Sequence, residues 1–322
     1  MLRPRPAGPF AGLLAAAALT AGCGTSPDAA PRPDPRHETR VERTPTPSAG
    51  PRSSTPPEQE TEQETEPAPE PDPDPEPDPE PEPGTVPPPW LGTRVLPETA
   101  TGYGAVRPTP RVLRERRFTL PDAVPALPGD GYASRVVNPP PADVLARSTW
   151  EPACPVAAED LAWLRVAFRG FEGDRHTGEL LVAADAADDL AGVFGDLWRA
   201  GFPLEQLTIT PRSALDAPPT GDGNGTGAFV CRPVTGGTSY SEHAYGRAVD
   251  VNPFQNPYLR DLPAGRVVLP ELASAYLDRD DVRPGMVTPD GPVVRAFARI
   301  GWAWGGDYRS LKDYQHFSAT GG

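Results

Sequence analysis

The chain has 322 residues, 47 of them proline, and a formal net charge of −14. Residues 58–82 hold 12 acidic side chains and no basic one, so the rest of the chain sums to only −2. This distribution argues against a basic nucleic-acid-binding face, and no apolar run is long enough for a membrane-spanning helix. Because 25 of the prolines lie in the first 100 positions, we expect one folded domain near the C-terminus.

The N-terminus has the layout of an export signal. Arg3 and Arg5 precede an apolar stretch over residues 9–20, and small residues then lead to Cys23. This order is typical of a secretory signal peptide, which we assign to residues 1–22. The sequence Thr-Ala-Gly-Cys at its end resembles a bacterial lipoprotein signal, in which the cysteine becomes the new N-terminus and receives lipid. An ordinary secretory signal is the alternative, and either one predicts an exported protein.

A proline- and acid-rich linker follows, which we assign to residues 23–141 and expect to be disordered. Within it, residues 67–84 alternate proline with an acidic residue. Because a residue before proline is kept out of the helical region, this repeat favours an extended polyproline II conformation. At about 3.1 Å per residue, the repeat would span about 56 Å. It is either a semi-rigid spacer or low-complexity sequence whose length has no role. The apolar residues between 90 and 138 either pack on the domain or stay loose.

Residues 142–322 have an ordinary globular composition and form the predicted domain. The apolar patterns predict, in chain order, a short helix ending near 164, strands over 164–171 and 178–184, an amphipathic helix over 190–198 stopped by Gly201, strands over 204–210 and 248–252, and a last helix over 293–300 stopped by Gly301. Because strands and helices mix without a regular βαβ period, the α+β class is favoured.

Two polar motifs contain the residues best suited to chemistry. In the first, His243 lies seven residues ahead of Asp250, and in the second, Asp313 lies three residues before His316. Two imidazoles and one carboxylate suit a zinc ion and leave a fourth position for water. A further carboxylate beside such a site can act as a general base on that water. Residues three apart on one strand point to opposite faces, so a bulge or turn must separate Asp313 from His316.

Both motifs resemble those of a known family. The stretch SEHAYGRAVD (241–250) is similar to the SxHxxGxAxD signature of the D-Ala-D-Ala carboxypeptidase family of zinc peptidases, and DYQHF (313–317) is similar to its second motif. The family includes VanX/VanY-type enzymes and phage L-Ala-D-Glu endopeptidases, and the likeness covers roughly residues 144–318. It implies a hedgehog/DD-peptidase-like fold, in which helices flank a small central antiparallel sheet.

The resemblance also assigns roles by position. It implies that His243, Asp250 and His316 bind zinc and that Asp313 is the catalytic acid and base. Many relatives have the longer Glu at that place, and Asp resembles the endopeptidase branch. Arg232 matches an arginine that stabilises the oxyanion or holds a substrate carboxylate, with an ordinary surface role as the alternative.

Three further residues lie within or just after the first motif. We expect Ser241, Tyr245 and Asn252 to shape the site through hydrogen bonds, although core or turn positions would explain them equally well.

The three cysteines fit an exported protein. With Cys23 lipidated, Cys154 and Cys231 remain in an oxidising compartment and are expected to form a disulfide. Zinc ligation by Cys231 is the less favoured alternative, because three ligands are already assigned and the site needs an open position.

Taken together, the sequence predicts a zinc-dependent peptidase of peptidoglycan stem peptides, most plainly a D-Ala-D-Ala carboxypeptidase. Alternatives are an L-Ala-D-Glu-type endopeptidase, a non-catalytic zinc-containing module that recognises the cell wall, and a structural wall lipoprotein. We expect a monomer without a nucleic-acid partner, attached to the membrane by lipid at Cys23 and facing the wall.

Overall fold

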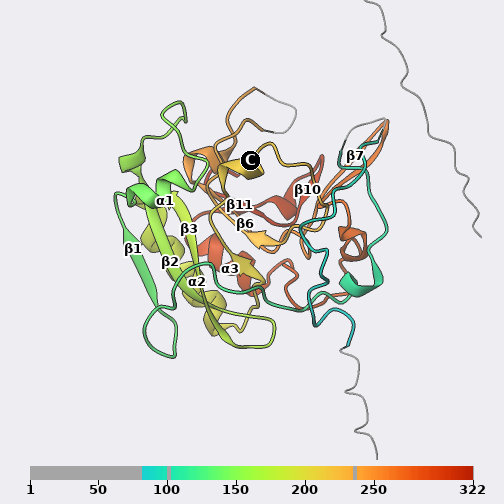
Figure 1. The fold of residues 1–322 in the computed structure, drawn as a ribbon, viewed down its shortest axis with the longest axis horizontal. Coiled ribbons are helices and arrows are strands. Elements are labelled where there is room, and N and C mark those ends of the chain that lie inside the picture. Colours follow the sequence, from blue (N-terminus) through green and yellow to red (C-terminus); the bar gives the residue numbers. More distant parts are fainter. Residues whose placement is uncertain (1–81, 100–102, 235–237, 322) are drawn as a thin grey trace, which may run out of the picture. The chain divides into compact units, whose positions relative to one another are not determined.

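The computed structural model describes residues 82–99, 103–234 and 238–321, all of which fall in one compact unit, Asp74–Gly322. Figure 1 shows its arrangement. The signal peptide, Cys23 and the linker up to residue 81 lie outside the described residues. Among the residues described, no helix is long and apolar enough to cross a membrane.

The unit mixes short strands, three α-helices and several 3-10 turns. The helices are α1 (Ala142–Ala146), α2 (Ala187–Arg199) and α3 (Pro292–Arg299). The strands are β1 (Ser134–Val137), β2 (Leu161–Arg169), β3 (Arg175–Ala183), β4 (Gln206–Leu207), β5 (Gly225–Thr226), β6 (Ala248–Asp250), β7 (Tyr258–Leu262), β8 (Gly265–Leu269), β9 (Ala303–Trp304), β10 (Lys312–Asp313) and β11 (His316–Ser318). The 3-10 turns are η1 (Arg111–Leu113), η2 (Ala158–Asp160), η3 (Ala184–Ala186), η4 (Arg212–Ala214), η5 (Glu242–Tyr245), η6 (Ala273–Tyr276) and η7 (Gly305–Asp307). The predicted α+β class is therefore confirmed.

The two longest strands, β2 and β3, form an antiparallel sheet with β1 in the order β1-β2-β3. β2 and β3 pair along nine residues, from Leu161 opposite Ala183 to Arg169 opposite Arg175. Helix α2 packs on this sheet through one apolar face, whose members are Leu190, Val193, Phe194 and Leu197. This face follows the helical spacing of the sequence, and the chain leaves the helix at Gly201, whose φ of +65° suits glycine.

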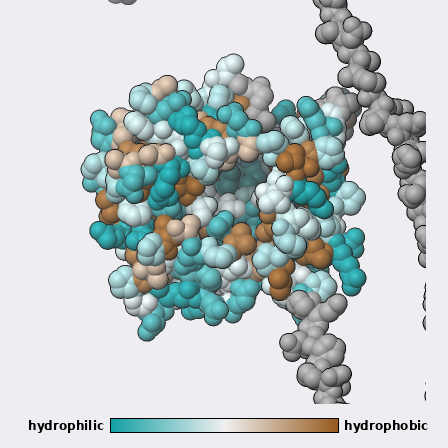
Figure 2. All heavy atoms as spheres, viewed as in Figure 1, coloured by the Kyte–Doolittle hydropathy of each residue, from teal (hydrophilic) through white to brown (hydrophobic). Residues whose placement is uncertain are grey.

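Two smaller antiparallel sheets carry the polar motifs. One has the order β6-β11-β9 and the other the order β10-β7-β8. The main core runs under the first of them and includes α3, Trp302, Trp304 and Phe317, whose ring stacks on that of Phe297 at 4.1 Å between centroids. Figure 1 shows β6 and β11 side by side near the middle of the molecule. In the same view, Figure 2 shows a largely hydrophilic face.

The structure differs from the sequence analysis over residues 82–141, which were assigned to the disordered linker. The described part of this segment is folded. Leu113 and Phe118 are fully buried in a second core with Phe254 and Tyr276. Composition does not predict this core, because the segment is rich in proline. Periodicity does not predict it either, because its apolar side chains are scattered over extended chain without a helical or strand period.

A buried ion pair holds this segment against the rest of the unit. The Arg116 guanidinium donates to both carboxylate oxygens of Glu205 at 2.7 and 2.6 Å and to the Asp222 carbonyl at 2.7 Å. Arg116 and Glu205 are both about 1% exposed, and the guanidinium lies over the ring of Phe254. Such a pair is tolerated in a core because every charge is matched.

Candidate metal centre

His243 is placed by a short capped turn. Ser241 caps η5, its hydroxyl accepting from the His243 amide at 3.4 Å, and Gly246 ends the turn with a φ of +68°. A Cβ on Gly246 would lie 2.4 Å from the Ala183 nitrogen, so the turn sits directly against the end of β3. The buried His243 ring donates from Nδ1 to the Ala228 carbonyl at 2.5 Å. That bond leaves the Nε2 lone pair available for a metal ion.

The other two ligands are directly opposite each other across a strand pair. In the antiparallel pairing of β6 with β11, His316 lies opposite Asp250. The His316 Nδ1 atom is 3.1 Å from Asp250 Oδ1, and His243 Nε2 is 3.3 Å from the same oxygen and 3.2 Å from His316 Nδ1. The structure therefore brings the three predicted ligands together, although they span 73 positions of the sequence.

This triangle fits zinc by its size as well as by its donors. Ligand atoms at about 2.0–2.1 Å from a tetrahedral zinc ion are separated by about 3.3 Å. The three observed separations lie between 3.1 and 3.3 Å, and each donor is of a type that zinc accepts. Three protein ligands would leave one tetrahedral position open, as in catalytic rather than structural zinc sites.

The charges within the triangle keep its carboxylate ionised, which is the form that binds metal, but they also favour a protonated His316, whose proton a bound metal ion would have to displace. Burial alone would raise the pKa of Asp250, but the charges and hydrogen bonds of His243 and His316 outweigh burial and hold it far below its usual range. Burial would lower the pKa of His316, yet the hydrogen bond and charge of Asp250 raise it. Without metal, the histidines thus compensate a buried carboxylate, and a cation would take over that role.

Asp313 lies beside the triangle on a different sheet. It ends β10, which pairs with β7 so that Asp313 faces Tyr258. A two-residue turn at Tyr314 and Gln315 then carries the chain into β11. Burial, followed by the charge of Asp250, raises the Asp313 pKa to about 6, and its Oδ1 atom is buried without a hydrogen-bond partner. A buried carboxyl that has one oxygen without a hydrogen-bond partner and titrates near neutrality suits a general base.

The remaining predicted site residues have other surroundings. Asn252 is fully buried, and its side chain bonds to the backbone of Pro203, Glu205 and Gly285, which is a role in the fold. Tyr245 is exposed on η5. The Arg232 guanidinium donates to the Pro233 carbonyl at 3.1 Å.

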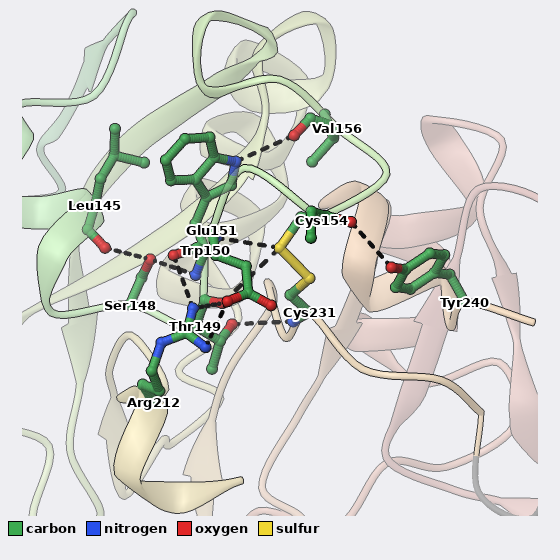
Figure 3. The surroundings of a disulfide bond; sticks show 11 residues. Leu145, Ser148, Thr149, Trp150, Glu151, Cys154, Val156, Arg212, Cys231 and Tyr240 are labelled. Atoms are coloured by element: carbon green, nitrogen blue, oxygen red, sulfur yellow. Dashed lines mark hydrogen bonds and ion pairs between the residues drawn. A yellow bond between two sulfur atoms is a disulfide. The ribbon is translucent and has the colours of Figure 1, made fainter. Parts of the chain in front are cut away.

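A disulfide joins Cys154 to Cys231, with 5.9 Å between their Cα atoms (Figure 3). The Cys231 amide donates to the Thr149 hydroxyl at 3.0 Å, and the Tyr240 hydroxyl donates to the Ala153 carbonyl at 3.0 Å. The bridge and these bonds attach Cys231 and Tyr240, which both precede η5, to the loop after α1. Cys231 is therefore not available as a metal ligand.

Two residues near the triangle were missed in the sequence analysis. The negative charge of Glu242 acts on the pKa of both His316 and Tyr308, and Tyr308 is also affected by Asp313 and Asp250. Glu242 is an unspecified position of the SxHxxGxAxD signature. Tyr308 lies two residues after the Gly305–Gly306 pair and ahead of the second motif, and an aromatic residue near two glycines is the only signal.

A protein-family model matches the segment that contains the candidate centre. The family model described as D-alanyl-D-alanine carboxypeptidase matches residues 235–319. This segment is of the D-alanyl-D-alanine carboxypeptidase family. The match includes all three residues of the metal triangle and Asp313, so the matched segment contains the whole candidate centre. No curated protein and no solved structure matched the chain.

Proposed function

We propose that this protein is a zinc-dependent peptidase that removes the terminal D-alanine from peptidoglycan stem peptides. The observation that carries the proposal is the triangle of His243, Asp250 and His316, beside which the buried Asp313 carboxyl has one oxygen without a hydrogen-bond partner. The family match supports a peptidase. Zinc, cleavage at D-alanine and the wall substrate are our extension of it.

Bound zinc and Asp313 would have different roles in the reaction. Bound zinc would polarise the scissile carbonyl and lower the pKa of water. Asp313 takes a proton from the attacking water as the new C–O bond forms and the carbonyl electron pair moves onto oxygen. The C–N bond then breaks as the carbonyl re-forms, and Asp313 gives its proton to the leaving amine. Water is consumed, and an acid and an amine are released.

The export signal and linker suggest where this would happen. We propose that lipid at Cys23 anchors the protein to the outer side of the cell membrane and that the linker lets the peptidase segment reach the wall. The chain would act as a monomer, because the triangle and Asp313 come from one copy.

The test is digestion of purified muropeptides with pentapeptide stems by the full exported chain, with and without a chelator, read by mass spectrometry. We expect loss of one D-alanine, abolished by chelation and reduced at least about 10³-fold in Asp313→Asn. Asp261→Asn is the matched control, because Asp261 is an exposed carboxylate of β7 paired with Arg266.

The products separate the alternatives. Fragments cut between L-Ala and D-Glu would replace the carboxypeptidase assignment with the endopeptidase one. Stoichiometric zinc with no product from any muropeptide would show a recognition module, and absence of bound metal would contradict a zinc enzyme altogether.

A further inference from the structure

Two buried polar atoms beside the metal triangle lack hydrogen-bond partners. Among the residues described, only five buried side-chain nitrogen or oxygen atoms have no partner, and two of them are Asp313 Oδ1 and the Tyr308 hydroxyl. Buried polar groups are nearly always paired, so an unpaired one indicates a missing water, ion or ligand. One of these atoms is an acceptor when ionised, and the other can donate.

The two side chains are neighbours, because both pack on the same glycine. A Cβ placed on Gly305 would lie 2.9 Å from Asp313 Cβ and 3.2 Å from Tyr308 Cε2. The absence of a side chain at Gly305 therefore lets the Tyr308 ring and Asp313 approach each other. Tyr308 directly follows η7, and its amide donates to the Gly305 carbonyl at 3.2 Å, which fixes the backbone of this turn.

The Tyr308 hydroxyl is buried without a hydrogen-bond partner, within electrostatic reach of the centre. Burial is the main cause that raises its pKa, and the negative charges of Asp250 in the triangle and of Asp313 and Glu242 beside it raise this pKa further. Ser318 is close enough to lower its pKa, but the two hydroxyls do not have the geometry of a hydrogen bond. The Ser318 oxygen instead accepts from the Gly321 amide at 3.2 Å.

We propose that Tyr308 is a further catalytic residue, whose hydroxyl donates a hydrogen bond to the oxygen that becomes negative when water adds to the scissile carbonyl. The inference rests on the proposed peptidase function. Asp313 on one side of the reacting carbon takes the proton of water, and Tyr308 stabilises the oxyanion while keeping its own proton. The bond is lost again when the carbonyl re-forms and the C–N bond breaks.

A donor that bonds only to the developing oxyanion stabilises the transition state more than the bound substrate. Its loss should therefore lower kcat and leave KM nearly unchanged. The same donor should strengthen binding of a phosphinate pseudopeptide, whose tetrahedral, negatively charged group resembles the oxyanion. It should not affect zinc affinity, since Tyr308 is outside the ligand triangle.

The experiment compares the full chain with Tyr308→Phe, which removes one unpartnered hydroxyl and leaves the ring in place. We expect kcat on a pentapeptide-stem muropeptide and affinity for the phosphinate analogue of D-Ala-D-Ala each to fall about 10²-fold. Zinc content and affinity, measured by competition with a chelating dye, should match wild type. Tyr132→Phe is the control, because its hydroxyl bonds to the Ala191 carbonyl on α2, away from the centre.

Each other outcome counts against the proposal. If Tyr308→Phe keeps wild-type kcat and phosphinate affinity while wild type cleaves, Tyr308 has no such role, and the peptidase assignment stands. If Ser318→Ala reproduces the loss, Tyr308 acts through the fold and is not catalytic. If wild type cleaves no muropeptide and binds no phosphinate, the proposed function fails, and this inference fails with it.

Discussion

The raised pKa of Asp313 should lower the free energy of unfolding at neutral pH, and this effect can be measured in the protein without metal. The Asp313 pKa is about 6 in the folded state against 3.8 ordinarily, because burial and Asp250 disfavour its charge. Well below pH 3.8 the group is protonated in both the folded and unfolded states, and it has no effect on stability. As pH rises from 4 to 6, the unfolded state loses this proton first, so the folded state becomes relatively less stable.

Asp313→Asn, which resembles the protonated form at every pH, should therefore stabilise the chelated protein at pH 7 by up to about 3 kcal/mol. The gain should disappear near pH 4. Urea unfolding of both proteins at the two pH values measures it. An equal difference at pH 4 and pH 7 would mean that the Asp313 pKa is not raised.

At the scale of elements, η7 and β10 are in contact through a glycine that has no room for a side chain. A Cβ on Gly305 would lie 2.6 Å from the Asp313 carbonyl oxygen, a backbone atom that cannot rotate away. Gly305→Ala should shift Asp313 relative to the metal triangle and reduce kcat by about 10²-fold, since small displacements of a catalytic group have effects of that size. Metal affinity should change much less, because the ligands lie on β6, β11 and η5.

Helix α2 offers the matched control. Gly192 has nothing within 4 Å of its Cβ position, so Gly192→Ala should keep full activity and stabilise the protein by about 1 kcal/mol through helix propensity. Steady-state kinetics and thermal unfolding of the two variants test the pair. Equal kcat values would show that the close contact at Gly305 does not position Asp313.

How far the sequence predicts these elements depends on how local their signals are. Helix α2 and the β2–β3 pair follow periodic patterns, and the two motifs marked the residues of the triangle. The pairing of His316 with Asp250 could not be predicted, because it joins strands far apart in the sequence. Tyr308 was missed because its importance depends on its position beside Asp313, which the Gly305 turn creates.

At the scale of the whole molecule, the peptidase unit extends well before residue 142. Leu113 and Phe118 complete the second core, and Arg116 neutralises the buried Glu205. Without them the chain would lose about 1.5–3 kcal/mol for each large apolar side chain and leave an unpaired buried charge that costs about 3–5 kcal/mol. These losses together approach the total stability of an ordinary domain.

A chain that begins at residue 142 should therefore be largely unfolded, while one that begins at residue 82 should unfold at the same urea concentration as the full protein. Urea titration and binding of a dye to exposed apolar surface measure the difference. Equal midpoints for all three chains would restore the boundary at residue 142.

The direct pairing of Asp250 with His316 also limits how this protein can diverge. Side chains alternate between the faces of a strand, so a single inserted or deleted residue within β6 or β11 turns a ligand to the opposite face. Between these strands the chain passes through the β7–β8 hairpin and several turns, where a change in length need not alter their register. Over evolutionary time, insertions should accumulate at the β7–β8 hairpin loop and be eliminated from β6 and β11, although all are equally easy to produce as mutations.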